Sequence, residues 1–174
     1  IPKGNKSRAS GDGLGFSTHS PIQRMTFDTD APAAVLLSQD EGTLYVAESS
    51  TDPGGTRELR AYPVLNDGTL GDYDLLHTFG ADSRGPHLGI SGMCLDSDGN
   101  ILACAGSSQI GPGSLIYVFS PAGRVRETHP APEGATNCAF GDSDLTTLYL
   151  TTESGNLYRA PSTGHSGWTL FQPG

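Results

Sequence analysis

The sequence has little basic charge and no long hydrophobic run. Lysine and arginine number 10 against 19 aspartates and glutamates, giving a formal net charge of -9. Phosphate binding needs clustered Lys and Arg, so no nucleic-acid partner is expected. The basic cluster Lys3, Lys6 and Arg8 is diluted by Gly, Asn and Ser and is interpreted as a solvated loop. Apolar runs are only a few residues long, so no membrane-spanning segment is expected.

The cysteine content is also low. Cys94, Cys104 and Cys138 are an odd number of cysteines and do not suggest a disulfide framework. If Asp98-Gly99 forms a two-residue turn, Cys94 lies opposite Ala103, and its sulfur points to the opposite face of the sheet from that of Cys104. All three are interpreted as small buried hydrophobic residues rather than a bridge or a metal site. The cysteines therefore do not indicate the cellular compartment of the protein.

Helical periodicity is missing, and a repeated hairpin pattern is present instead. Gly89 to Gly106 contains two apolar runs around Asp98-Gly99, and Ala33 to Glu48 and Thr136 to Thr152 have the same layout. Units repeated roughly 45 to 60 residues apart indicate stacked supersecondary structures. With 24 glycines and 12 prolines, the chain is predicted to be all-β. Each unit has about four short strands, the size of one β-propeller blade.

The domain organisation follows from this pattern. Residues 1–174 are predicted to form a single propeller portion, with residues 1–20 a loop or the remnant of an earlier blade and residues 21–174 the blades. The chain begins Ile1-Pro2 without Met or an apolar leader. We expect that processing or truncation removed what came before.

These residues carry a family resemblance. GISGMCLDSDGNILACAG (89–106) and the segment from Ser114 to Ala160, with its motif TNCAFG…LYLT, resemble the C-terminal half of the senescence marker protein/gluconolactonase/luciferin-regenerating-enzyme-like family. PAAVLLSQDEGTLYVAES (32–49) resembles the blade before it. The resemblance implies part of a six-bladed β-propeller, with about three to four blades in this chain. An open part-propeller leaves strand edges unpaired, so N-terminal blades of the same protein are expected to complete it.

The resemblance also implies hydrolysis of a small lactone or ester at a divalent cation, Ca or Zn. In the family the ion is held by a Glu of the first blade, an Asn and an Asp. At the Asn position this sequence has Ala33, and at the Asp position it has Ser91. The loss of one amide and one carboxylate oxygen predicts a weakened or degenerate site, with ion affinity lower by on the order of a hundredfold.

Other residues remain candidates for the site. His87, just before the central hairpin, is a catalytic candidate, although a loop histidine is more often a turn residue. Asp28, Asp30 and Asn137 are candidates for holding a cation, with turn formation or backbone bonding as their structural alternatives. Glu48 is interpreted as capping its blade edge. Two hypotheses stay open: a lactonase or esterase, and a non-catalytic propeller that binds a small polar ligand or a protein partner.

Overall fold

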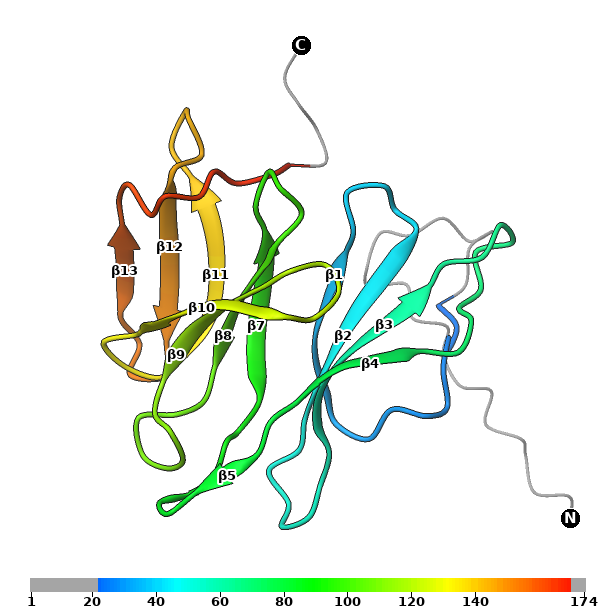
Figure 1. The fold of residues 1–174 in the computed structure, drawn as a ribbon, viewed down its shortest axis with the longest axis horizontal. Helices are drawn as coiled ribbons and strands as arrows, with labels where there is room; N and C mark the ends of the chain where they lie inside the picture. The colour runs from blue at the N-terminus through cyan, green and yellow to red at the C-terminus, as the bar shows by residue number, and fades with distance from the viewer. Residues whose placement is uncertain (1–21, 170–174) are drawn as a thin grey trace, which may run out of the picture.

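The computed structural model describes residues 22–169, which form three antiparallel sheets arranged side by side (Figure 1). No helix occurs in this part of the chain, which confirms the all-β prediction, and residues 1–20 lie outside it. No helix of the described residues is long and apolar enough to cross a membrane.

We name the three sheets blades 1, 2 and 3. Blade 1 contains β1 (Pro32–Leu37), β2 (Thr43–Ser49), β3 (Arg57–Pro63) and β4 (Asp74–Thr78). Blade 2 contains β7 (Ile90–Leu95), β8 (Ile101–Ala105), β9 (Leu115–Phe119) and β10 (Val125–Pro130). Blade 3 contains β11 (Ala135–Gly141), β12 (Thr147–Thr152) and β13 (Leu157–Ala160). A small hairpin, β5 (Ala81–Asp82) and β6 (Gly85–Pro86), connects blades 1 and 2.

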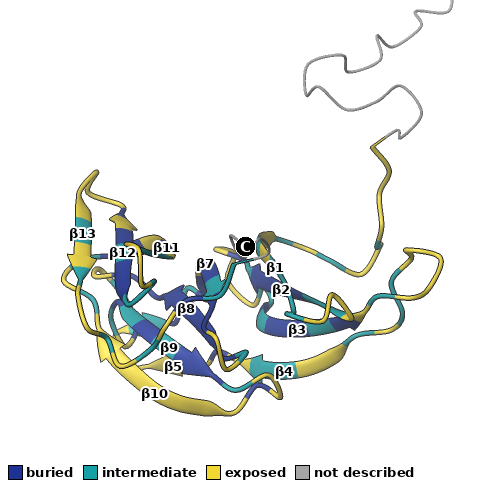
Figure 2. Ribbon diagram, turned by 90° about the horizontal axis from the view of Figure 1, so that it is seen from above, coloured by how far each residue is buried: buried dark blue, intermediate teal, exposed yellow. Residues whose placement is uncertain are grey.

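Blade 2 lies in the middle and is packed on both faces. The side chains of β8 are all buried and alternate between two hydrophobic clusters. Ile101 belongs to the cluster shared with blade 1, and Leu102 belongs to the cluster shared with blade 3. Figure 2 shows the buried strands β8 and β9 at the centre and the exposed strand β10 at the outer rim. Burial on both faces explains why β8 is an uninterrupted apolar run.

The inner strands of the blades follow one another along one side of the arc. β7 packs between β1 and β11, so the first strands of successive blades are neighbours (Figure 2). The first strand of each sheet in chain order therefore approaches the same axis, which is the arrangement that the repeated hairpins predicted.

The central hairpin differs from its predicted register by one residue. Cys94 pairs with Leu102 rather than Ala103, and the loop has three residues, Ser97 to Gly99. The backbone NH of Gly99 donates to the carbonyl of Asp96 at 3.1 Å, and Gly99 has a φ of 79°. This is the three-residue hairpin with glycine in the left-handed region.

The one-residue difference reverses the prediction for the cysteines. With Cys94 opposite Leu102 and Gly92 opposite Cys104, both sulfurs lie on the face toward blade 3. The expectation of opposite faces was therefore wrong, because it assumed the shorter turn. The prediction that the cysteines pack among apolar side chains is confirmed, with Cys104 and Cys138 buried and Cys94 partly buried.

Candidate functional site

The inner strand of each blade begins with a β-bulge. The unpaired residue is Ala33 in β1, Ser91 in β7 and Thr136 in β11. All three are exposed. A bulge bends the strand and redirects a side chain, so the three blades present equivalent positions at their inner ends. We call Ala33, Ser91 and Thr136 the bulge row.

Neighbouring residues hold the bulge row in place. The Ser49 hydroxyl at the end of β2 donates to the carbonyl of Ile90 at 2.6 Å, which ties blade 1 to the start of β7. The Thr136 hydroxyl lies 2.9 Å from that of Thr151 on β12. Asn137, also exposed, uses its Oδ1 to accept from the backbone NH of Cys138 at 2.9 Å. The amide oxygen of Asn137 is thus already engaged with the backbone.

The bulge row does not fit a divalent cation. It presents one methyl group and two neutral hydroxyl groups, whereas Ca²⁺ takes six to eight oxygens that include carboxylates, and Zn²⁺ prefers imidazole, thiolate or carboxylate. Among residues 22–169, no group of three or more His, Cys, Asp or Glu side chains is placed to hold a metal ion.

Asp28 and Asp30 lie in the segment that leads into β1, and both are exposed. Oδ1 of Asp28 accepts from the hydroxyls of Thr26 at 2.6 Å and Tyr62 at 3.0 Å. The hydrogen bond from Thr26 is the main cause that lowers the pKa of Asp28. Because Tyr62 lies in the middle of blade 1, Asp28 is directed to that sheet rather than to the bulge row.

Glu48 does more than cap the edge of its blade. Its side chain is fully buried, and its Oε2 accepts from the backbone NH groups of Asp30 at 3.0 Å and Ala31 at 2.7 Å. Arg60 Nη1 lies 3.9 Å from Oε1 of Glu48, while Arg60 Nη2 lies 2.7 Å from Glu58. The buried carboxylate thus fixes the segment that precedes Ala33. Removing the carboxylate would leave these two backbone NH groups without their acceptor, which costs about 1–3 kcal/mol.

His87 lies in the hydrophobic core between blades 1 and 2 rather than in a solvated turn. It is 2% exposed, and its ring stacks on Phe79 with the centroids 4.4 Å apart. Nδ1 accepts from the backbone NH of Gly89, and Nε2 lies 3.2 Å from the hydroxyl of Tyr117. Burial lowers the pKa of His87 to about 4. Both ring nitrogens are therefore engaged inside the protein.

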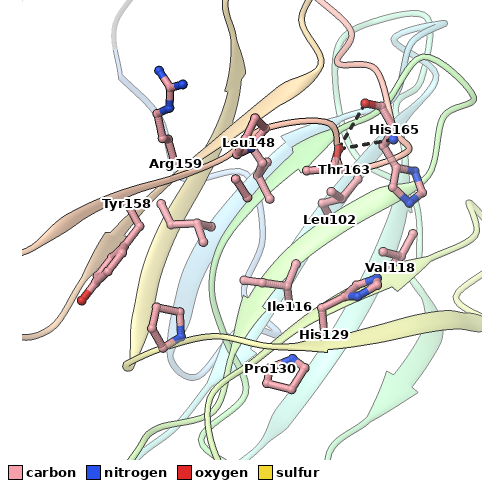
Figure 3. A pocket seen from close by; sticks show the side chains of 14 residues that line it. Leu102, Ile116, Val118, His129, Pro130, Leu148, Tyr158, Arg159, Thr163 and His165 are labelled. Atoms are coloured by element: carbon pink, nitrogen blue, oxygen red, sulfur yellow. Dashed lines mark hydrogen bonds between the residues drawn. The ribbon is translucent and has the colours of Figure 1, made fainter.

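A cavity of about 350 Å³ opens between blades 2 and 3, away from the bulge row (Figure 3). Its floor is apolar, with Leu102, Ile116 and Val118 of blade 2 among the lining side chains. His129 and His165 line its rim (Figure 3). The cavity therefore has the apolar floor and the few polar groups that are common in ligand pockets.

The two histidines that line this cavity belong to a series of polar contacts that the sequence did not reveal. Nδ1 of His165 lies 2.9 Å from Oδ2 of the buried Asp96, and its Nε2 lies 3.6 Å from Oε2 of Glu127. The same Glu127 oxygen lies 2.8 Å from Nε2 of His129, and this contact is the main cause that lowers the pKa of Glu127. Asp96 and His165 are 69 residues apart, so no local motif signals the pair.

Comparisons with known proteins agree with this architecture. The model of the SMP-30/gluconolactonase/LRE-like region matches residues 3–154. A 6-deoxy-6-sulfogluconolactonase of Pseudomonas putida is 29% identical over 152 residues, which are 87% of this chain and 48% of that protein.

Solved structures show the same relationship. A gluconolactonase of Xanthomonas campestris is 31% identical with a TM-score of 0.59, over 82% of this chain and 41% of that one. A luciferin-regenerating enzyme has a TM-score of 0.63 at 20% identity, over 81% of this chain and 48% of that one. The chain thus spans about half the length of these relatives. This chain belongs to the SMP-30/gluconolactonase/LRE-like family, and its three sheets are part of a β-propeller.

Proposed function

We propose that this chain is part of a gluconolactonase-like propeller that acts on a small lactone or ester and whose metal-dependent hydrolysis is weakened. The observation that carries the proposal is the bulge row, which presents Ala33 and Ser91 at equivalent exposed positions in a family with lactonase members. A methyl group and a hydroxyl group stand where the family resemblance implies an amide and a carboxylate. The blades are retained, while two oxygen ligands for Ca or Zn are lost.

The remaining polar groups suit binding better than hydrolysis. The hydroxyls of Ser91 and Thr136 are exposed and at equivalent places in adjacent blades. Such hydroxyls donate hydrogen bonds to the oxygens of a lactone or ester. Hydrolysis also needs a base to activate water, and neither a methyl nor a hydroxyl serves as one at neutral pH. We propose further that N-terminal blades of the same protein complete the propeller.

Titration calorimetry with Ca²⁺ and Zn²⁺ tests this proposal. The unaltered protein is compared with the double variant Ala33→Asn, Ser91→Asp, which restores both oxygen ligands. Ala139→Asp is the matched control, because Ala139 is exposed on an inner strand but pairs regularly with Tyr149. We expect the double variant to bind a cation about a hundredfold more tightly than the unaltered protein, equivalent to about 3 kcal/mol.

Two results would contradict the proposal. Micromolar or tighter cation binding by the unaltered protein would show that the site is not weakened. Equal binding by the double variant and the Ala139→Asp control would show that the bulge row does not hold the ion. Hydrolysis of a small lactone, followed by acid release at constant pH, is measured on the same proteins. Turnover is expected to rise only in the double variant.

The alternative function is a non-catalytic propeller that binds a small polar ligand or a protein partner. The observation that favours it is the absence of a carboxylate from the bulge row. This alternative predicts no lactone turnover by the unaltered protein, whether or not the double variant gains activity. Measurable turnover by the unaltered protein would argue against it.

A further inference from the structure

The three cysteines meet at the seam between blades 2 and 3. Cys94 lies on β7, Cys104 on β8 and Cys138 on β11. The sulfur of Cys138 is 3.5 Å from the sulfur of Cys94 and 3.5 Å from the carbonyl oxygen of Leu102. Two thiols from adjacent blades are thus in contact, although 44 residues separate them in the chain.

A close approach of the two backbones brings the sulfurs together. A Cβ atom at Gly92 would lie 2.7 Å from the Cα of Asn137 and 2.7 Å from the carbonyl oxygen of Thr136. Only glycine leaves room for β11 at this distance from β7. Cys94 is two residues after Gly92, and Cys138 is one residue after Asn137. A disulfide needs Cα atoms that are about 4.4–6.8 Å apart, and such a separation requires closely packed strands.

We propose that Cys94 and Cys138 form an oxidation site, at which a small hydroperoxide converts the two thiols into a disulfide across the seam. The sulfur of Cys94, the more exposed of the two, attacks the peroxide O–O bond, which gives a sulfenic acid and releases water or an alcohol. The sulfur of Cys138 then attacks the sulfenic sulfur, an S–S bond forms, and water leaves. Two thiols are oxidised and one peroxide is reduced, so electrons and protons balance.

The surroundings of the thiols agree with these roles. Cys94 is partly exposed and Cys138 is buried, so a small oxidant meets Cys94 first. Hydrogen bonding among the three thiols lowers the pKa of Cys138, which favours its attack on the sulfenic sulfur.

The disulfide would join the inner strands of two blades. The hydrophobic cluster shared by blades 2 and 3 packs this seam, and its cysteines are free. A cross-link between β7 and β11 would keep blades 2 and 3 together when noncovalent packing is weakened. Cys104 is buried beneath the pair and has no role in the bond itself.

The test treats the folded chain with hydrogen peroxide, alkylates the remaining thiols and measures the intact mass. One disulfide lowers the mass before alkylation by about 2 Da and leaves one alkylatable thiol. Trypsin without reductant should then give residues 85–124 linked to residues 127–159. The variant Cys104→Ala should give the same link, and Cys94→Ala should not. Trp168 fluorescence verifies that each variant is folded.

Each outcome decides the proposal. A link in the unaltered chain and in Cys104→Ala, but not in Cys94→Ala, supports it. Three alkylatable thiols in the treated, folded chain would overturn it. A link that persists in Cys94→Ala would also overturn it, because Cys104 would then be the partner of Cys138. The variants are required because residues 85–124 contain both Cys94 and Cys104, so the linked peptides of the unaltered chain do not show which of the two is bonded to Cys138.

Discussion

Acid should destabilise this fold through the buried His87. Its ring is 2% exposed, Nδ1 accepts from the NH of Gly89 at 3.0 Å, and Nε2 lies 3.2 Å from the Tyr117 hydroxyl. A neutral ring with its proton on Nε2 satisfies both contacts. Protonation of Nδ1 would place two NH groups against each other and a charge in an apolar core. The folded state therefore resists protonation of this residue.

The magnitude follows from the difference in proton affinity between the two states. Burial, with a smaller contribution from His77, lowers the pKa of His87 from 6.5 to about 4. Because the folded pKa is the lower one, the unfolded chain takes up the proton first as the pH falls. The stability is complete above about pH 6.5 and is lost progressively toward pH 4. At about 1.36 kcal/mol per pH unit the full loss is about 3 kcal/mol, and at pH 4.5 it is about 2.5 kcal/mol.

Urea unfolding at pH 7.5 and pH 4.5 measures this loss. Trp168, the single tryptophan, packs against the hydrophobic cluster shared by blades 1 and 2, so its fluorescence reports unfolding. Other groups also respond to acid, so the informative quantity is the difference between variants. His87→Gln should lose about 2.5 kcal/mol less between the two pH values than the unaltered chain. The control His129→Gln removes only an exposed contact with Glu127, so its loss should differ from that of the unaltered chain by much less than 2.5 kcal/mol. Equal losses in His87→Gln and the unaltered chain would refute the reasoning.

Two further predictions concern packing and hydrogen bonding. Gly92→Ala should destabilise the chain by about 1–3 kcal/mol, because its Cβ would meet the backbone of Asn137 at 2.7 Å. Gly80→Ala, where no atom lies within 4 Å of the new Cβ, should change the urea midpoint little, and a similar loss in both would contradict this account. Asp96→Asn should destabilise the fold by about 1–3 kcal/mol, because Oδ2 of Asp96 accepts from Nδ2 of Asn100 and contacts Nδ1 of His165. A double-mutant cycle with His165→Gln that shows no coupling would exclude the contact with His165 as part of the cause.

Much of the fold could be predicted because its signals are local. Alternation of apolar residues and turn residues such as Asp98-Gly99 indicated hairpins, and their repetition indicated stacked blades. The units that begin at Ala33 and Thr136 were also recognised in the sequence, and Ala33, Ser91 and Thr136 each have the same unpaired place in their strands. Residues at aligned positions of a repeat can be compared without knowing how the blades pack.

The errors arose where one residue of register or a distant contact decides the outcome. The turn after Asp96 has three residues rather than two, because the Asp96 side chain accepts from the backbone NH groups of Asp98 at 3.0 Å and Asn100 at 2.7 Å. That difference placed Cys94 and Cys104 on one face. Side chains alternate along a strand, so a shift of one residue exchanges the two faces.

The sequence by itself determined that the chain is all-β, that it is built from repeated hairpins and which residues begin the inner strands. Only the tertiary structure decided that His87 is buried, that His165 meets Asp96 and that Cys94 contacts Cys138. The physical reason is the distance along the chain between the residues that interact. Strand and turn preferences act between residues close in the chain, whereas burial and contacts between blades depend on segments tens of residues apart that meet only when the sheets pack.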